Sequence, residues 1–380
     1  GGYVQPIEFV KAVERTQTSH LPDPATDKTF KQGLGAYFTA MNYGGIGFAI
    51  LEDRKFKTGP QQIAQKHDGP RPDHITEPNM ADQVDDPNAE LLGDEQLAFL
   101  RNWVKNWQGQ EIKAAISQTV FCGVATHHGS SGNYLLGDMD CNGWPPTGRD
   151  KAVDALRRGG AFLLAGDQHL PTLVRHGIEK PGDAIVSFVT PAGATGYQRW
   201  WRPDDMGMER LAGGPHGTRP NTGLYRDAFG NIIDVLAVGN PPTEIGDVDS
   251  REELAQRKSA GWGLVIFDKP AHEVTMQAWR IRPGLDVREP RAEDQFPGWP
   301  MTFNAYASYG VSAHKLPAVA ADDDVVVRVR NADGELVCAG RAHDGRFVPT
   351  VYAPGAYTIE VLAPDDETVA RTETVKWGDG

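Results

Sequence analysis

The stretch Ala161–Gly177, AFLLAGDQHLPTLVRHG, decides the fold. Its first five residues are a continuous apolar run, which is typical of a strand that is covered on both faces. Gly166 ends the run, and an acid and a histidine, Asp167 and His169, follow two positions apart. We therefore expect a buried strand whose carboxyl end carries polar side chains.

The segment before this strand, TGRDKAVDALRRGG (147–160), predicts a helix that Gly159 and Gly160 stop. A helix that feeds a buried strand is half of a βαβ unit, and ligands bind outside the carboxyl ends of the strands in such sheets. A carboxylate and an imidazole are suitable ligands for a divalent metal ion. A turn aspartate followed by a surface histidine has the same pattern, so both interpretations stay open at this point.

The same patterns predict further elements around this strand. Helices are predicted over residues 8–16 and 93–107, and we expect Trp103 and Trp107 of the second helix to lie in the core. The remaining predicted strands are residues 46–51, 111–121 and 184–193, with a β-hairpin over 261–281.

Two long stretches rich in Gly, Pro and polar residues separate these elements, at 57–90 and 197–260. Loops of this length usually carry function, so we expect substrate selectivity to reside there. Trp200 and Trp201 in the second stretch either line the rim of a site or anchor the loop in the core.

The end of the chain has a different pattern. Residues 315–378 alternate between apolar and polar side chains and carry the turn signals NADG, APGA and APDD. This pattern predicts a small, all-β sandwich module. The stretch FPGWP near Pro300 marks the boundary, which leaves residues 1–300 as the main α/β domain.

The composition limits the partners of the protein. The chain has 380 residues and a net charge of −13, which disfavours nucleic acid or an anionic membrane as the main partner. A small phosphate substrate remains compatible with this charge, because one cluster of metal and arginine can outweigh the average field. No apolar run approaches the ~20 residues that a membrane helix needs. We therefore expect no membrane span and no nucleic-acid partner.

Several predicted strands end in polar clusters. If these ends converge on one edge of an α/β sheet, they form the kind of site that catalysis needs. The clusters are Glu52-Asp53-Arg54, then His127-His128 with Asp138 and Asp140, then Asp167 and His169.

Taken in order, the segments between residues 35 and 282 resemble PhoD-like alkaline phosphatases of the calcineurin-like metallophosphoesterase superfamily. No single motif is specific, but their order and intervals together carry the resemblance. The segments are GFAILEDRKFK (47–57), LLGDEQLAFLRNWV (91–104), MDCNGWPPTGRDKAVDALR (139–157), LLAGDQH (163–169), FVTPAG (188–193) and GWGLVIFD (261–268).

The resemblance implies metallophosphoesterase-type β-sheet layers flanked by helices, and a site with two divalent or trivalent metal ions, Ca and Fe in that family. It would make Asp167 and His169 metal ligands and Arg54 a phosphate contact. By position, His127 or His128 would donate a proton to the leaving group. The alternatives are an ion pair between Arg54 and Asp53 or another carboxylate, and a pair of solvated loop histidines.

Other expected ligands are missing. The superfamily carries most of its metal motifs in an N-terminal half, and this chain lacks them. Asp73-His74 lies in a Pro-rich loop, and Asp138 and Asp140 come in the wrong order; we expect Asp140 to orient Arg149 or Trp144 instead. The opening residues, GGYVQPIEF, show neither an initiator methionine nor an export signal. We expect a piece of a longer polypeptide, an incomplete fold, and a site that another part of the protein or a partner chain completes.

The expected function is hydrolysis of phosphate monoesters or diesters by a hydroxide that two metals activate, with a small phosphate ester as substrate. The resemblance also implies an exported, periplasmic or extracellular protein. One alternative is the same metal chemistry on another ester. A second alternative is a non-catalytic binding or structural module, or a subunit of a split enzyme built on the same fold.

Overall fold

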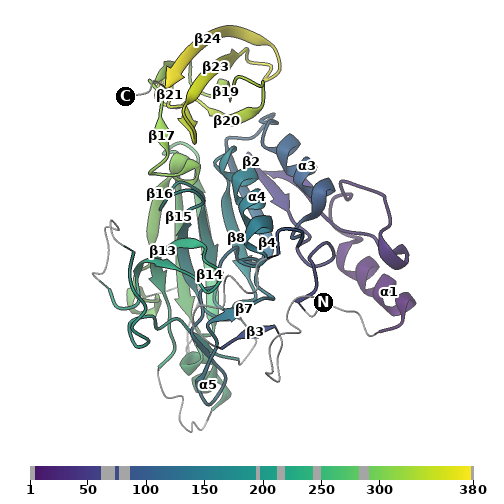
Figure 1. Cartoon of the computed structure of the whole chain (residues 1–380), viewed down its shortest axis with the longest axis vertical. Coiled ribbons are helices and arrows are strands. Elements are labelled where there is room, and N and C mark those ends of the chain that lie inside the picture. Colours follow the sequence, from purple (N-terminus) through teal and green to yellow (C-terminus); the bar gives the residue numbers. More distant parts are fainter. Residues whose placement is uncertain are drawn as a thin grey trace.

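The computed structural model describes residues 5–60, 73–76, 86–193, 197–211, 219–242, 250–281 and 291–377. Within this part, the chain is a mixed α/β protein with many strands and few helices (Figure 1). No helix there is both long and apolar enough to cross a membrane. The α-helices are α1 (Ile7–Thr18), α3 (Gly93–Trp103), α4 (Pro146–Arg157) and α5 (Arg251–Arg257).

A central eight-stranded sheet holds the fold together, in the order β1-β2-β4-β8-β10-β9-β13-β12. Its middle strands β2, β4, β8 and β10 run parallel, and they confirm the four strands that the apolar runs predict. The other four pair antiparallel. The bounds are β1 (Thr39–Tyr43), β2 (Ile46–Ile50), β4 (Ile112–Thr119), β8 (Phe162–Gly166), β9 (Thr172–His176), β10 (Val186–Val189), β12 (Gly223–Arg226) and β13 (Ile232–Val238).

Strands β12 and β13 correct one prediction, because both lie in the stretch 197–260 that the sequence pattern assigned to a loop. Strand β9 lies just after the Asp-Gln-His segment and was also not predicted. These three strands extend the parallel sheet with an antiparallel half. Of the loop predicted at 57–90, residues 61–72 and 77–85 lie outside the described part of the chain.

Helices α3 and α4 contact each other, and their apolar residues share one core with strands of the central sheet. Trp103 and Trp107 are buried in this core, as predicted. Helix α4 ends at Arg157, and Gly160 follows with a φ of 59°. A Cβ on Gly160 would lie 2.2 Å from the ring of Tyr309, so only glycine fits this turn. The glycine pair therefore stops the helix, as the sequence indicates.

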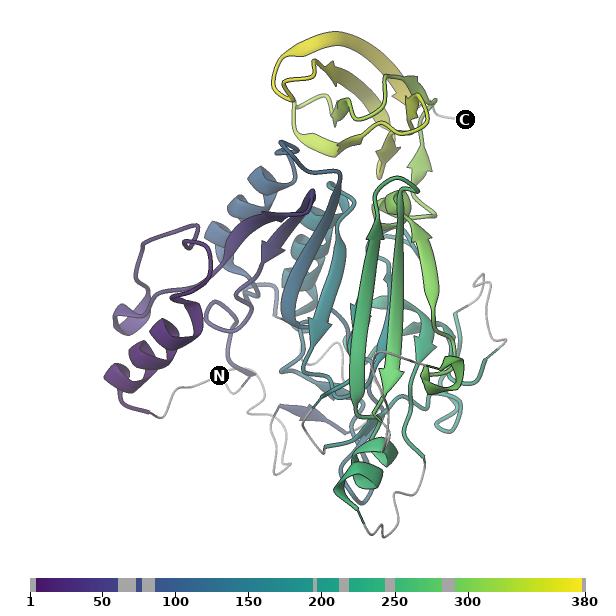
Figure 2. The same cartoon turned by 180° about the vertical axis from the view of Figure 1, so that it is seen from behind.

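The other face of the central sheet packs against a second, three-stranded sheet (Figure 2). The predicted hairpin is confirmed as β14 (Gly261–Asp268) and β15 (Glu273–Arg280), and β16 (Met301–Asn304) adds a third antiparallel strand after Pro300. Phe162 and Phe188 of the central sheet share a core with Val274 and Met276 of β15. Two short 3-10 helices lie on either side of β16 in the sequence, η4 (Ala292–Asp294) before it and η5 (Ala305–Tyr309) after it.

Short ladders flank the carboxyl ends of the parallel strands. One ladder joins β3 and β7, and a three-stranded one has the order β11-β5-β6. Both bring loops far apart in the sequence to the same edge of the central sheet. Their bounds are β3 (His74–Ile75), β5 (His127–His128), β6 (Asn133–Tyr134), β7 (Gly137–Asp138) and β11 (Arg199–Trp200), and the 3-10 turn η1 (Lys31–Gly33) lies nearer the amino end.

Residues 314–377, here termed the C-terminal β unit, form a four-stranded antiparallel sheet in the order β20-β19-β23-β24. Two short ladders, β17 with β22 and β18 with β21, share its apolar core. The unit lies at the end of the molecule where β4 begins (Figure 1). Its strands are β17 (His314–Lys315), β18 (Val319–Ala320), β19 (Val326–Arg330), β20 (Leu336–Arg341), β21 (Arg346–Phe347), β22 (Thr350–Val351), β23 (Gly355–Leu362) and β24 (Val369–Trp377).

Candidate functional site at the strand ends

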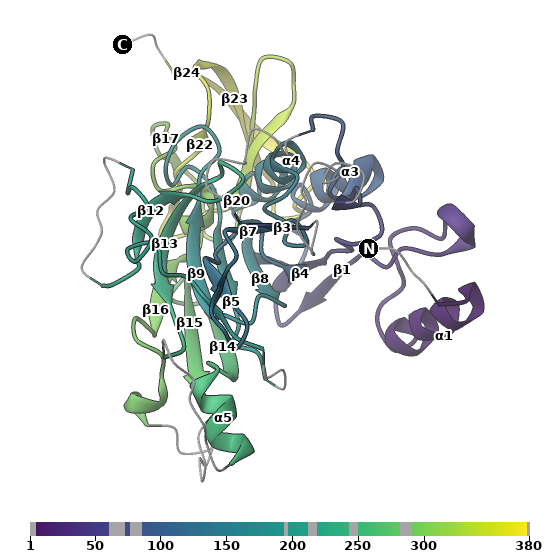
Figure 3. The same cartoon turned by 60° about the horizontal axis from the view of Figure 1, so that its bottom comes forward.

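The carboxyl ends of β2, β4 and β8 meet around the guanidinium group of Arg54. Figure 3 shows two of these strands, β4 and β8, next to each other in the central sheet. Nη2 donates to Asp167 Oδ2 at 2.7 Å and to Thr119 Oγ1 at 3.1 Å. Nη1 contacts the Asp140 carboxylate, and Nε donates to Gln118 Oε1 at 3.2 Å. Burial opposes the charge of Arg54, but Asp140, Asp53 and Asp167 outweigh burial and raise its pKa. Arg54 is therefore a fixed cation among carboxylates.

Asp53 forms the buried floor beside Arg54 and is 0% exposed. Its Oδ2 accepts from Ser117 Oγ at 2.5 Å and from Asn142 Nδ2 at 2.6 Å. Its Oδ1 lies 4.0 Å from Arg54 Nε and accepts no hydrogen bond from the described residues. A buried carboxylate needs such partners to stay ionised. Asp53 thus links β2 to β4 and sets where Arg54 leaves the strand.

Gln96 of helix α3 fixes the loop that carries these residues. Its side chain accepts from the Glu52 backbone N–H at 2.8 Å and donates to the Glu52 carbonyl at 2.7 Å. Burial raises the pKa of the Glu52 carboxyl. The backbone N–H groups of Arg54 and Lys55, which donate to this carboxyl, lower the pKa by a smaller amount. The helix therefore positions Arg54 through the backbone before it.

Asp167 and His169 both have left-handed backbones, with φ of 62° and 58°. This region is uncommon for residues other than glycine, costs about 1–3 kcal/mol, and clusters at functional sites. The Asp167 side chain is 49% exposed, although Arg54 and Thr119 hold one of its oxygens. His169 Nδ1 lies 3.0 Å from the Tyr197 carbonyl oxygen. Because a carbonyl only accepts, Nδ1 carries a proton, and in the neutral imidazole Nε2 is then the nitrogen with the lone pair.

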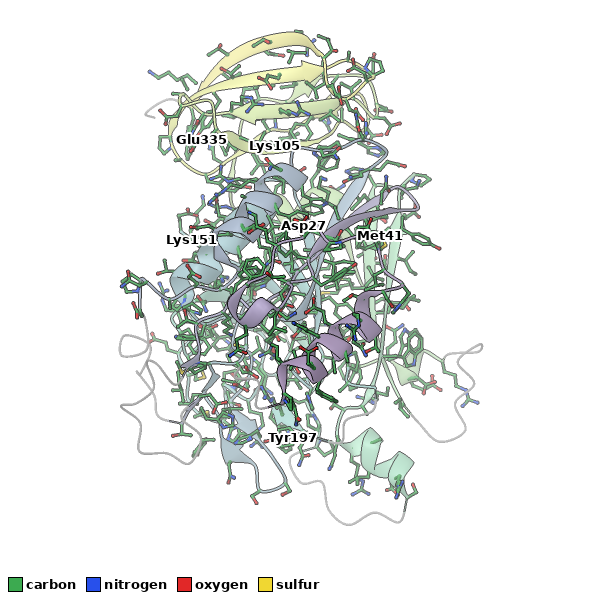
Figure 4. All side chains as sticks on the ribbon, turned by 90° about the vertical axis from the view of Figure 1, so that its right-hand side faces the viewer. Asp27, Met41, Lys105, Lys151, Tyr197 and Glu335 are labelled. Carbon is green, nitrogen blue, oxygen red and sulfur yellow. The ribbon has the colours of Figure 1, made fainter. Side chains whose placement is uncertain are left out.

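Tyr197 connects His169 with His128, the two histidines that the sequence places on separate loops. Its hydroxyl contacts His128 Nδ1, and its ring lies edge-on to His169 with a centroid distance of 5.7 Å. Figure 4 places Tyr197 at the opposite end of the molecule from Glu335 of the C-terminal β unit. The tyrosine is therefore part of the strand-end region, although no motif pointed to it.

His127 is more enclosed than its neighbour, and only 6% of it is exposed. Its Nδ1 lies 2.8 Å from Thr126 Oγ1, and β5 pairs with β11 so that His127 lies opposite Trp200. Burial, and then the charge of Arg202, lower the pKa of His127, which favours the neutral imidazole. Trp200 and Trp201 are both 1% exposed, so they anchor this segment in the core rather than line a rim.

Lys57 is a second cation at this edge that the sequence analysis did not single out. Its Nζ donates to the carbonyl oxygens of Asp140 at 2.9 Å and of Cys141 at 2.6 Å. Burial lowers the pKa of Lys57 to about 8, and Arg54 contributes to the shift. Asp140 thus faces Arg54 and Lys57, and not the expected Arg149, which instead donates to His176 Nδ1 and to Asp150.

A separate group of potential metal ligands lies on the β3–β7 ladder. Ligand atoms of Asp73, His74 and Asp138 all lie within 4.8 Å of one another. Among the described residues this is the group of three or more such side chains that is close enough to hold a metal ion, and it does not include Asp167 or His169. Sequence order alone gave no reason to join Asp73 and His74 with Asp138.

The comparisons with known proteins add one partial likeness. No protein-family model matches the chain, and no curated protein matches it. A solved structure of PhoD aligns with 50% of this chain at 20% sequence identity and a TM-score of 0.34. The chain spans 36% of that PhoD chain. Because this alignment is partial and its TM-score low, any function has to rest on the geometry of the site.

Proposed function

We propose that this chain is part of a metal-dependent hydrolase that acts on small phosphate esters, either monoesters or diesters. The observation that supports this function best is the meeting of Arg54 with Asp167 at the ends of adjacent parallel strands. His169 follows on the same strand end, and the backbones of Asp167 and His169 are both left-handed. A guanidinium, a carboxylate and an imidazole at one edge of a sheet are groups that enzymes use to hydrolyse phosphate esters.

Asp167 and His169 would hold a metal ion in this proposal, and their surroundings fit that role. His169 donates its Nδ1 proton to a carbonyl, as metal-bound histidines commonly do, and so keeps Nε2 for the ion. Asp167 is half exposed, so its carboxylate is open to a ligand. The bound ions, two by resemblance to the family, would supply a hydroxide nucleophile and neutralise charge on the phosphate.

Arg54 would bind the phosphate oxygens. A guanidinium matches two oxygens of a phosphate at once, but here each of its five N–H groups already has an acceptor. Once Asp167 serves as a ligand, Arg54 keeps Asp140 and can turn Nη2 toward the substrate. Lys57, with a pKa of about 8, adds a second positive charge close to Asp140.

His128 is the better candidate for a proton donor to the leaving group. His127 has a lowered pKa and is buried, so it is mostly neutral near pH 7 and a poor acid. His128 is less buried and contacts the Tyr197 hydroxyl, which also links it to the strand end of His169. Tyr197 would therefore orient both imidazoles.

Another segment of the same protein or a partner chain would complete the site. Ile116 on the central strand β4 is 36% exposed, and Leu264 and Ile266 on the edge strand β14 are 41% and 44% exposed. These exposed apolar side chains are the positions that such a segment or chain would cover. From the resemblance of the sequence to PhoD-like alkaline phosphatases, we also propose that the protein is exported.

A non-catalytic module is the second candidate, and one observation favours it. The guanidinium of Arg54 is saturated by protein acceptors, as expected of an ion pair that only joins strands. This alternative predicts no hydrolysis of any phosphate ester and no effect of Asp167 or His169 on ligand binding.

The test measures metal content by mass spectrometry together with phosphomonoesterase and phosphodiesterase rates. It uses this chain and a form extended at its amino end, each as wild type and as the Asp167→Asn/His169→Gln variant. We expect the extended wild type to bind metal and hydrolyse esters, and the variant to lose hydrolysis and the metal that Asp167 and His169 would hold. Inactive protein in both forms, with the same metal content in wild type and variant, would leave the non-catalytic module.

A further inference from the structure

The ladder between β3 and β7 brings together three side chains from distant parts of the sequence. His74 and Asp138 are paired partners in the antiparallel register, and the Asp73 carbonyl accepts from the Met139 N–H at 2.9 Å. Partners in such a register project their side chains to the same face. His74 and Asp138 are 9% and 5% exposed, and Asp73 is half-buried.

An apolar cluster holds this ladder in place. Ile75, Met139 and Phe229 pack together under it and are 1%, 0% and 3% exposed. Gly137 leaves room for this packing, because a Cβ there would lie 2.9 Å from that of Ala228. Apolar packing therefore anchors Ile75 and Met139, the neighbours of His74 and Asp138, and a metal site requires such an anchored scaffold.

Hydrogen bonds fix the Asp138 carboxylate before any ligand arrives. Arg199 Nη2 donates to Oδ2 at 2.7 Å, and the Asp140 N–H donates to Oδ1 at 3.0 Å. Such outer partners are typical of carboxylates that bind metals. Two carboxylates thus lie beside the single guanidinium of Arg199, and carboxylate oxygens attract a divalent cation.

We propose that Asp73, His74 and Asp138 form a binding site for a divalent transition-metal ion. Two carboxylates with one imidazole suit Mn²⁺, Fe²⁺ or Zn²⁺, whereas Ca²⁺ and Mg²⁺ prefer oxygen ligands alone. Three protein ligands leave further coordination positions open, as in catalytic rather than structural sites. This site is distinct from the pair Asp167 and His169, so it does not rest on the proposed hydrolase function.

The site lies close to the strand-end region. The His74 ring is edge-on to that of His128, with a centroid distance of 5.0 Å, and Asp138 is two residues from Asp140, a partner of Arg54. An ion on the ladder would thus be adjacent to the loops that carry His128 and Asp140.

Isothermal titration of the whole chain with MnCl₂, and separately with ZnCl₂, tests the proposal. We expect the wild type to bind one ion on the ladder, and His74→Gln and Asp138→Asn each to weaken it by about tenfold or more. The asparagine keeps an oxygen for Arg199. Circular dichroism without metal checks that both variants fold, and in the wild type alone the ion should raise the melting temperature.

Two control variants separate this site from others. The pair His343 and Asp344, 3.7 Å apart in the C-terminal β unit, controls for weak surface binding, so His343→Gln/Asp344→Asn should bind like the wild type. Retention of the ion by Asp167→Asn/His169→Gln supports the ladder site. Loss of the ion from that variant alone would overturn the ladder site and leave the proposed function standing. No binding at millimolar metal, or unchanged binding in both ladder variants, would overturn it as well.

Discussion

Arg54 at the strand ends and Arg341 under the C-terminal β unit each use all five N–H groups, yet their surroundings differ. Four of the five acceptors of Arg54 are side chains, and its partners Asp140 and Asp167 are 53% and 49% exposed. Arg341 pairs with Asp366, and both side chains are 10% exposed. Its other donors go to the backbone carbonyls of residues 107, 110 and 324.

The difference shows that an arginine whose N–H groups all donate hydrogen bonds can be either a structural or a functional residue. Backbone carbonyls are fixed acceptors that no ligand replaces, so Arg341 joins the C-terminal β unit to the segment before β4. The acceptors of Arg54 are one backbone carbonyl, an amide, a hydroxyl and two half-exposed carboxylates, and these carboxylates can exchange for a ligand. Four predictions test this difference between Arg54 and Arg341 and their surroundings.

Replacement of Arg341 should cause the largest loss of stability. Arg341→Met leaves the Asp366 carboxylate buried without its partner, and we expect the free energy of unfolding to fall by about 3–5 kcal/mol. Chemical denaturation measures it. Arg371→Met is the matched control, because the Arg371–Glu373 pair is 50% and 42% exposed and should contribute about 0–1 kcal/mol. Equal losses in the two variants would contradict a structural role for Arg341.

Replacement of Arg54 should instead affect function. If the proposed hydrolysis holds, Arg54→Met lowers its rate by about 100-fold or more, since a charge-stabilising donor to the phosphate is lost. The same variant should change the free energy of unfolding by about 1 kcal/mol or less, because the hydrogen-bonded carboxylates Asp140 and Asp167 are half exposed. The buried Asp53 keeps its hydrogen bonds from Ser117 and Asn142. Rates and denaturation curves are measured on one preparation. A loss of stability as large as that of Arg341→Met, with no loss of rate, would make Arg54 a structural ion pair.

Acid should weaken the contact between β15 and the C-terminal β unit through His272. Burial, and then the nearby His343, lower the pKa of His272 to about 4. The unfolded chain therefore binds more protons between pH 6.5 and 4, so this contribution is complete above pH 6.5 and is lost as the pH falls through that window. We expect a loss on the order of 2 kcal/mol.

Denaturation at pH 7 and pH 4.5 measures the His272 contribution. His272→Asn, which keeps a residue tolerant of the φ of 54°, should reduce the difference between the two pH values. An identical difference in wild type and variant would place the acid sensitivity elsewhere, for example at His176, whose pKa burial and Arg149 also lower.

The smallest expected effect is at Thr119. Its hydroxyl accepts from Arg54 and donates to Asp167 Oδ2 at 3.1 Å. Thr119→Val removes both hydrogen bonds while nearly keeping the shape, so we expect about 1 kcal/mol of lost stability and a modest drop in any hydrolysis. A valine variant as inactive as Arg54→Met would mean that the hydroxyl itself touches the substrate.

The four parallel strands could be predicted because each is a nearly continuous apolar run. Strands β9 and β13 escaped prediction for a physical reason. Arg175 and Asp234 interrupt their apolar pattern, and the two residues are register partners whose charged groups lie 3.4 Å apart. In the sequence, Arg175 and Asp234 each resemble loop residues. Only the pairing of the two strands explains why these charged side chains lie within a sheet.

The site was predictable only where its residues follow a predicted strand. Arg54 and Asp167 were found in this way, and the structure brings them together. Tyr197 comes 28 residues after His169 and meets it through a backbone carbonyl, which leaves no trace in residue type. Asp73 and His74 join Asp138 only because a two-residue ladder forms, and such short pairings have no sequence signature.

The C-terminal β unit and the strand-end region lie at different ends of the molecule. Arg341 of the unit binds the segment that leads into β4, while Tyr197 of the strand-end region lies toward the other end of the molecule (Figure 4). A surface or neighbouring domain that held the protein by the exposed outer strand β24 would leave the polar pole facing the medium. Small solutes would then reach Arg54 without passing the attachment, so an attachment at β24 would leave the site accessible.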